Sequence, residues 1–248
     1  MSAIFITGAN EGIGFYMCRA LLEAGHSVAA LDVDTSNLAA LAASSSGGLL
    51  CYEADVRDAA AVQSAVNDAA NRFSGLDAAV HNACRCPFLS FGECEDSDFL
   101  STYYVNYFGA VHLARATVPH LKTGGRICFT SSGVGVTGFP GLTAYASSKG
   151  AIEALAKCLR LEYPQFSFHI LHPPLTRTRS SSPLPVPPEF MASPEDVGRG
   201  LAKRLFSKRF IICHSRAQAV QTRLCYAFPL KLGRLISLMT SRASSSRT

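Results

Sequence analysis

Short apolar runs recur along the chain, separated by stretches in which apolar residues are spaced as on one face of a helix. The runs fall at residues 4–6, 27–31, 49–54, 77–81, 126–130, 166–171 and 209–213. Short runs of this kind are typical of strands that are buried on both faces. Strands that alternate with helices in this way predict one α/β domain, built on a doubly wound parallel sheet of about seven strands.

The intervals between the runs predict the helices. These span residues 15–22, 35–44, 58–73, 98–122, 142–162 and 193–207. Asp58 and Asp96 are predicted to be N-cap residues, because aspartate is favoured at that position. Ser193 precedes a proline that suits the first turn of a helix. The helix over 98–122 is expected to bend near Pro119, and Gly124-Gly125 is expected to end that unit.

Polar or glycine positions follow the ends of several predicted strands. They are Gly8, Asp32, Asp55, Asn82 and Ser132. The carboxyl ends of parallel strands meet at one edge of the sheet, and ligands of open α/β sheets bind beyond that edge. The convergence of these positions therefore predicts a binding site there.

The first strand runs into a glycine-rich turn, Thr7–Gly14, with the spacing G-x-x-x-G-x-G. Such a turn places backbone N–H groups and a helix N-terminus against a pyrophosphate, although any tight turn can require glycine. Asp32, at the end of the next strand, suits both hydroxyls of an adenosine ribose and would repel a 2′-phosphate. The alternative is that Asp32 only caps the following turn.

Tyr145 and Lys149 lie four residues apart in a predicted helix, so they share one face about one turn from each other. A phenol titrates near pH ~10 and exchanges protons poorly at neutral pH. A neighbouring ammonium stabilises the phenolate and brings the pKa towards the working range. Ser132 is placed to hydrogen-bond the same substrate oxygen. This spacing also occurs by chance, so a purely structural role stays open.

Together these features resemble the short-chain dehydrogenase/reductase family, over about residues 3–213. The glycine-rich turn Thr7–Gly14 matches the family's cofactor turn, and Asp55-Val56 matches its adenine contact. The residues that match its catalytic tetrad are Asn106, Ser132, Tyr145 and Lys149. The resemblance implies a Rossmann-type fold and an oxidoreductase that moves a hydride between a nicotinamide and a secondary alcohol or ketone.

The resemblance also implies residue roles. Tyr145 would be the general acid/base, and Ser132 would steady the substrate oxygen. Lys149 would lower the pKa of the phenol and bind the nicotinamide ribose, and Asn106 would hold a water in a proton relay. The implied cofactor contacts are Gly8, Asn10, Glu11, Gly12, Ile13, Gly14, Asp32, Asp55, Val56, Asn82, Ala83, Tyr145, Lys149, Pro173, Thr176 and Thr178. Asp32 favours NAD(H) over NADP(H), and neither Asn10 nor Glu11 supplies a cation for a 2′-phosphate.

Some positions depart from the family pattern. His81-Asn82-Ala83-Cys84 stands where the family usually has Asn-Asn-Ala-Gly, and Pro174 stands where it usually has glycine. Pro173-Pro174-x-Thr-x-Thr is similar to the 3-ketodihydrosphingosine reductase branch. That branch usually prefers NADPH, so an NADPH-dependent reductase of long-chain lipid ketones is an alternative, against which Asp32 argues.

Composition narrows the class of protein. Nine cysteines lie scattered through apolar segments with no C-x-x-C pair, so we expect reduced thiols and no metal or disulfide site. With no signal peptide at the N-terminus and no apolar run of about 18 residues, a cytoplasmic location is expected. Eleven of the 23 Lys/Arg lie at or after Arg199, which leaves 12 against all 18 Asp/Glu in residues 1–198, a net of −6. The basic character belongs to the tail, and nothing resembles a nucleic-acid module.

The tail is expected to be an extension, residues 215–248, of a catalytic domain over 1–214. From Leu230 its apolar and basic residues suit an amphipathic helix, which would either lie on an anionic membrane or pack on protein. The expected partners are a small hydrophobic substrate and a second copy of the chain, in a homodimer or homotetramer. The substrate pocket is expected among residues 84–94, 134–142 and 180–191.

Two functions of different classes remain. The first is an NAD(H)-dependent oxidoreductase that acts on a hydrophobic secondary alcohol or ketone. The second is a non-catalytic dinucleotide sensor on the same fold, because a fold alone does not decide its function. The presence of all four residues of the catalytic tetrad favours the enzyme.

Overall fold

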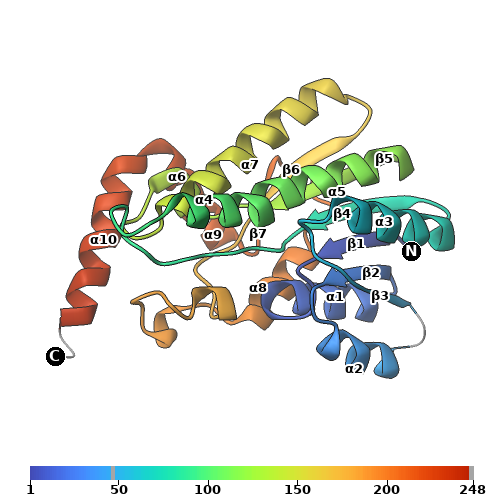
Figure 1. Cartoon of the computed structure of the whole chain (residues 1–248), viewed down its shortest axis with the longest axis horizontal. Coiled ribbons are helices and arrows are strands. Elements are labelled where there is room, and N and C mark those ends of the chain that lie inside the picture. The colour runs from blue at the N-terminus through green and yellow to red at the C-terminus, as the bar shows by residue number, and fades with distance from the viewer. Residues whose placement is uncertain (46–47, 246–248) are drawn as a thin grey trace.

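Seven parallel strands form one sheet in the order β3-β2-β1-β4-β5-β6-β7 in the computed structural model, which describes residues 1–45 and 48–245 (Figure 1). The strands are β1 Ala3–Thr7, β2 Ser27–Asp32, β3 Leu49–Glu53, β4 Leu76–His81, β5 Leu121–Thr130, β6 Ser167–His172 and β7 Ile211–Cys213. The apolar side chains of the central strands β1, β4 and β6 are buried on both faces, while the edge strand β3 is only partly buried. The predicted doubly wound, Rossmann-type sheet is confirmed.

Helices cover both faces of the sheet (Figure 1). One layer holds α1 Gly12–Glu23, α2 Ser36–Ser44 and α8 Pro194–Ala202; the other holds α3 Ala59–Phe73, α5 Gly109–Thr117 and α7 Thr143–Glu162. Each layer has its own apolar cluster, with Met17 and Leu201 in the first and Leu113 and Ile152 in the second. Burial of these apolar faces is the main stabilising contribution to such a fold.

The strand order changes direction between β1 and β4. From β1 the chain proceeds outward to β2 and β3, and then returns to the other side of β1 to form β4, β5, β6 and β7. A hydrogen bond of 3.0 Å between Thr7 Oγ1 and His81 Nδ1 joins the ends of these two central strands. A crevice forms at this point because the connections on its two sides run to opposite faces.

The predicted helix over 98–122 was wrong in extent. α4 begins at Asp96 with Glu95, not Asp96, as its N-cap, and ends at Tyr103. A π-helical turn over Tyr104–Phe108 follows before α5 resumes. Pro119 lies in a short 3-10 turn because it has no N–H to continue the helix.

Strand β5 therefore begins earlier than predicted. Leu121 already pairs with Leu76 of β4, and Gly124-Gly125 lies inside the strand, where the register shifts, and not at a helix end. The helix opened by Ser193 is confirmed with Ser193 as its N-cap, but it ends at Ala202, before residue 207. Asp58 is the N-cap of α3 as predicted, since its side chain accepts from two backbone N–H groups.

Two helices follow the last strand. α9 spans Arg216–Ala227 and was not predicted; α10 spans Pro229–Ser245 and agrees with the predicted amphipathic helix. α10 packs on the short helix α6 (Val134–Thr137), where Gly233 lies so close that an added Cβ would be 2.5 Å from the Thr137 carbonyl oxygen. Within the described part of the chain, no helix combines the length and apolar character needed to cross a bilayer.

Candidate active site

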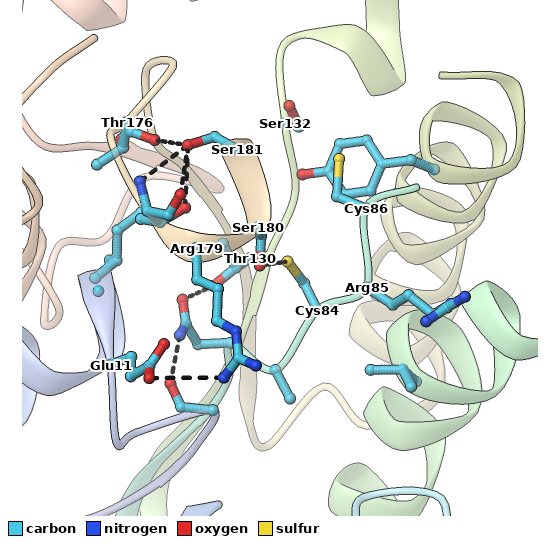
Figure 2. A pocket seen from close by; sticks show the side chains of 18 of the residues that line it. Glu11, Cys84, Arg85, Cys86, Thr130, Ser132, Thr176, Arg179, Ser180 and Ser181 are labelled. Atoms are coloured by element: carbon cyan, nitrogen blue, oxygen red, sulfur yellow. Dashed lines mark hydrogen bonds and ion pairs between the residues drawn. The ribbon is translucent and has the colours of Figure 1, made fainter. Parts of the chain in front are cut away.

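A cavity of about 700 Å³ opens at the carboxyl ends of the strands. Most of the predicted site residues line it: Gly8, Asn10, Glu11, Gly12, Ile13, Asp32, Asp55, Val56, Asn82, Ala83, Ser132, Tyr145, Lys149, Pro173, Thr176 and Thr178. Two predicted residues, Gly14 and Asn106, are not among the residues that line it. Figure 2 shows the labelled residues of this pocket, with the segment of Arg179, Ser180 and Ser181 facing Cys84 and Glu11.

The glycine-rich turn is shaped by close backbone contacts. Gly8 has φ +63°, and a Cβ on it would lie 2.5 Å from backbone atoms of Ala83. Gly14 does not line the cavity, yet a Cβ there would lie 2.0 Å from the carbonyl oxygen of Gly8. Gly12 has φ +56° and lies beneath Thr178, whose methyl group would be 3.0 Å from an added Cβ. The turn is thus held open as a backbone cradle, of the kind that receives a pyrophosphate.

Asp32 ends β2 at the mouth of this cradle. Its Oδ2 accepts a hydrogen bond of 2.9 Å from the backbone N–H of Asn10, and its Oδ1 accepts one of 2.8 Å from Val33. The Asn10 side chain has a local task, since its carbonyl oxygen accepts from the N–H groups of Asn37 and Leu38 at the start of α2. The carboxylate of Asp32 is therefore fixed by backbone while it still lines the cavity.

Two further predicted cofactor contacts, Asn82 and Asp55, are held by hydrogen bonds to other protein groups. Asn82 donates from Nδ2 to the carbonyl of Gly8 at 2.9 Å and accepts from Thr130 Oγ1 at 3.4 Å, which ties β4 to the glycine turn and to β5. Asp55 pairs with Arg57 at 2.6 Å. The hydrogen bonds from the Arg57 side chain hold the pKa of Asp55 below its usual value, so this carboxylate is ionised at neutral pH.

Tyr145 and Lys149 lie one turn apart on the buried face of α7 and both line the cavity, as does Ser132 beyond the end of β5. Lys149 Nζ donates to the carbonyl oxygen of Thr130 at 2.8 Å and lies 5.6 Å from the centre of the Tyr145 ring. The sequence predicts that these three side chains lie close together, and in the structure all three line one cavity.

The direction of the Tyr145 pKa differs from the sequence-based expectation. Burial raises the pKa of the Tyr145 phenol well above its usual value, the thiols of Cys84 and Cys86 act in the same direction, and a hydrogen bond with Ser132 opposes them. Burial lowers the pKa of Lys149. Desolvation is the largest cause of both pKa changes, because both groups leave water on folding. Tyr145 is therefore protonated at neutral pH.

Asn106 is buried in the π-helical turn. Its side-chain carbonyl accepts from the backbone N–H of Arg85 at 2.8 Å, and its amide donates to the Arg85 carbonyl at 3.0 Å and to Ser148 Oγ at 2.9 Å. These bonds fasten the segment around Arg85 to α7. In this arrangement the Asn106 side chain holds protein groups, where the resemblance had implied a water relay.

The residues from β1 to the segment after β6 match a known family. The short chain dehydrogenase family is recognised over residues 2–185. The chain belongs to the short-chain dehydrogenase family. It is accordingly an NAD(P)-dependent dehydrogenase/reductase, and the resemblance found in the sequence is confirmed.

Individual members of this family give the scale of the similarity. The oxidoreductase UcpA of Salmonella typhimurium is 32% identical, over 98% of this chain and 89% of its own length. The 3-ketodihydrosphingosine reductase of Mus musculus is 32% identical over 70% of this chain but only 50% of its own length. Among solved structures, an alcohol dehydrogenase from the archaeon Thermococcus sibiricus complexed with 5-hydroxy-NADP has a TM-score of 0.77 and 28% identity, covering 83% of this chain and 90% of that one.

The cavity of this short-chain dehydrogenase fits a dinucleotide. Gly8 and Gly12 leave the turn open where a side chain would fill it, and the N-terminus of α1 faces the same space. Asp32 supplies acceptors at the end of β2, while Lys149 and Tyr145 lie on the other side of the strand order. The glycine-rich turn would hold the pyrophosphate, Asp32 the adenosine ribose, and Lys149 with Tyr145 the nicotinamide part.

Cys84, Cys86 and Ser180 lie in the segments where the substrate pocket was expected, but their individual contacts, and any role for Arg179, were not predicted. Cys86 lines the cavity, and Cys84 Sγ lies 3.5 Å from Ser180 Oγ across it. Arg179 lies 3.8 Å from Glu11 at the rim (Figure 2). No spacing rule marks these residues, since only the folded course of the segment after Pro173 brings it over the glycine-rich turn.

Proposed function

We propose that this chain transfers a hydride between NAD(H) and a hydrophobic secondary alcohol or ketone, with Tyr145 as the general acid/base. The observation that carries the proposal is that Ser132, Tyr145 and Lys149 line the same cavity as the open glycine-rich turn. A bound nicotinamide cofactor supplies or accepts the hydride; the side chains position the substrate and move the proton.

The protonation state of Tyr145 supports reduction of a ketone. The buried phenol keeps its proton at neutral pH, as the direction of its pKa indicates. When a hydride reaches the carbonyl carbon, the oxygen becomes basic and takes the proton of the Tyr145 hydroxyl. Ser132 would donate a hydrogen bond to the same oxygen, and the ammonium of Lys149 would stabilise the phenolate that is left. Asn106 would hold the wall of the site in place.

The charges around the adenosine end support NAD(H). Asp32, Asp34 and Glu11 all line that part of the cavity, and a 2′-phosphate would meet their negative charge. Arg57 and Arg179 also line it, but they pair with Asp55 and Glu11 respectively. An NADPH-dependent enzyme would need one of these arginines to leave its carboxylate.

The lining supports a hydrophobic substrate. Beside the catalytic side chains lie Val134, Leu142 and Leu184, together with the thiols of Cys84 and Cys86. The mouse 3-ketodihydrosphingosine reductase is 32% identical to this chain, over half of its own length. Reduction of a long-chain lipid ketone with NADPH is therefore the second candidate, and it is separated from the first by the cofactor that supports turnover.

Replacing the phenol tests the chemistry. Tyr145→Phe keeps the ring and its packing and removes the proton that is transferred, so we expect turnover to fall by about 1,000-fold or more while NADH binding changes little. NADH binding is measured by fluorescence, and turnover with a panel of steroid, terpenoid, fatty and sphingoid ketones, each with NADH and NADPH. Tyr104→Phe, at an exposed position, is the control.

The outcomes separate the candidates. Activity retained in Tyr145→Phe would refute the proposed acid/base. A wild-type chain that binds NADH tightly but turns over no ketone or alcohol would favour the non-catalytic dinucleotide sensor. Turnover with NADPH alone, on long-chain ketones, would favour the second candidate.

The surface of α9 and α10 supports a peripheral contact with an anionic membrane. Apolar side chains exposed there are Val220, Leu224, Phe228, Leu230, Leu235, Leu238 and Met239. Arg223, Lys231 and Arg234 are exposed among them, and no acidic residue follows Asp196 in the sequence. Apolar and basic side chains together are what an anionic lipid surface attracts.

We also propose that residues 1–214 form the catalytic domain and residues 215–248 an extension of it, and that the chain assembles as a homodimer or homotetramer.

Liposome sedimentation tests the membrane contact. Lys231→Glu with Arg234→Glu should release the chain from vesicles that contain phosphatidylserine, and vesicles of phosphatidylcholine should bind neither protein. Lys157→Glu with Arg115→Glu makes the same charge change on exposed sites of other helices and serves as the control. If the variant with Lys231→Glu and Arg234→Glu binds vesicles as well as the wild type, the surface of α9 and α10 has no role in membrane binding. If the same variant loses a dimer that the wild type forms, while vesicle binding is unchanged, the surface contacts a second copy of the chain.

A further inference from the structure

A buried carboxylate lies behind the catalytic side chains and has no part in the proposed chemistry. Glu153 follows Lys149 by four residues on α7, so it lies one turn further along the same face. Only 5% of the surface of Glu153 is exposed to solvent. A carboxylate out of water must have hydrogen-bond donors or opposite charge nearby, since the desolvation cost is otherwise large.

Two hydroxyl groups supply those donors. Ser131 Oγ donates to Glu153 Oε1 at 2.8 Å, and the Tyr226 hydroxyl donates to Oε2 at 2.7 Å. His172 Nε2 lies 3.8 Å from Oε1, but burial lowers the pKa of this imidazole to about 4, so it is neutral at physiological pH. The carboxylate therefore depends on Ser131 and Tyr226.

The two hydroxyls come from distant parts of the chain. Ser131 lies between the end of β5 and the catalytic Ser132, and its backbone N–H donates to the Leu171 carbonyl at 2.8 Å. Tyr226 belongs to α9, beyond residues 2–185 that match the family. Its ring also lies 5.9 Å from that of His172 at the end of β6. One carboxylate thus joins α7, the strand end before Ser132, and the C-terminal helix.

We propose that Tyr226 and Glu153 are positioning residues that hold Ser131, and through it Ser132, in the place required for proton transfer. By this inference α9, which lies outside the residues that match the family, helps to position the active site through Tyr226. The inference rests on the proposed function, since it assigns the placement of Ser132 to this chain of hydrogen bonds. Small displacements of catalytic groups are costly because the reacting geometry is narrow.

Tyr226→Phe removes one hydroxyl and keeps the ring. We expect the kcat for ketone reduction to fall about 10-fold or more, while the Kd for NADH stays unchanged. The pH profile of kcat should also change, since a displaced Ser132 no longer opposes the rise in the pKa of Tyr145. Ser131→Ala breaks the same link from the other end, so the double variant should be no worse than the poorer single one.

The chain offers a matched control. The Tyr52 hydroxyl donates to Asp68 Oδ2 at 2.7 Å, a tyrosine–carboxylate bond of the same length that joins α3 to β3, the strand at the opposite edge of the sheet from β7; the Asp68 carboxylate is more exposed than that of Glu153. Tyr52→Phe should change thermal stability without any change in kcat or its pH profile. If Tyr226→Phe behaves like Tyr52→Phe, the bond is only structural and the proposal fails.

A readout without turnover separates this inference from the proposed function. Amide hydrogen exchange of residues 131–137 should become faster in Tyr226→Phe and stay unchanged in Tyr52→Phe. Unchanged exchange there would overturn the positioning role whatever the enzyme's chemistry. Faster exchange in a chain whose Tyr145→Phe variant keeps full activity would instead support the link to the Ser131 segment and overturn the assigned acid/base.

Discussion

The side-chain amine of Lys149 lies 5.6 Å from the centre of the Tyr145 ring, and its hydrogen bond goes to the carbonyl oxygen of Thr130, 2.8 Å away. The backbone at the end of β5 thus fixes the ammonium beside the phenol. Over this 5.6 Å and with an effective dielectric constant of about 20, an ammonium stabilises a phenolate by about 3 kcal/mol. That energy is available only when the phenol has given up its proton.

Lys149→Met should therefore lower kcat about 100-fold, because the phenolate left after proton transfer loses the neighbouring positive charge. Lys149→Arg keeps the charge and should retain part of the activity. Both are measured as kcat at pH 7, with NADH saturating. A Lys149→Met variant with the wild-type kcat would show that the ammonium has no influence on proton transfer from Tyr145.

Cofactor choice should depend on the charge of Asp32. Its carboxylate is held by the backbone N–H groups of Asn10 and Val33 and still lines the cavity. Asp32→Ser removes acceptors for the ribose hydroxyls, so the Kd for NADH should rise about 10-fold, while NADPH should bind more tightly than to the wild type. Titration of both cofactors by fluorescence measures the change. Equal weakening for NADH and NADPH would mean that Asp32 only caps the turn.

The sheet and its binding edge could be predicted because strand ends are local features of the sequence. Asp32 and Asn82 each follow an apolar run, and parallel strands bring such positions together without further information. The direction of the Tyr145 pKa could not be predicted, since it depends on how much water the folded chain removes from the phenol. The π-helical turn that buries Asn106 was missed because its apolar spacing resembles that of an α-helix.

Long-range hydrogen bonds were the other feature that the sequence did not reveal. Tyr226 lies 73 residues from Glu153, and no spacing rule connects them. The local sequence favours a helix that bends near Pro119 and continues to Lys122, whereas the pairing of Leu121 with Leu76 of β4 makes Leu121 the start of a strand. Tertiary pairing decides such cases over local propensity.

The glycine-rich turn should tolerate no methyl group at Gly14. A Cβ there would lie 2.0 Å from the backbone carbonyl oxygen of Gly8, which cannot move without displacing the turn. Gly14→Ala should lower the free energy of unfolding by about 3 kcal/mol or more and weaken NADH binding. At Gly92 nothing lies within 4 Å of an added Cβ, so Gly92→Ala is the control. The free energy of unfolding of both variants is measured by urea unfolding. An equal loss of stability in Gly14→Ala and Gly92→Ala would contradict the close contact at Gly14.

Buried histidines should make the stability of the fold depend on pH. Burial lowers the pKa of His81 to about 3 and that of His169 and His172 to about 4. In the unfolded chain these groups titrate near pH ~6.5, so below that pH the unfolded state binds protons that the folded state refuses. Their contribution to stability is therefore complete above pH ~6.5 and is lost as the pH falls towards 4.

His169 allows this to be measured away from the cavity, because its Nδ1 hydrogen-bonds the backbone carbonyl of Arg209 at 2.7 Å. Between pH 6.5 and pH 4.5 one such histidine accounts for about 2–3 kcal/mol of lost stability. His169→Gln cannot take up the proton in either state, so its loss over this range should be smaller than that of the wild type by that amount, whatever its stability at pH 7. Urea unfolding at several pH values gives the slopes, and His26→Gln, at a partly exposed position, is the control. Parallel slopes for His169→Gln and the wild type would mean that the imidazole is not held neutral by the fold.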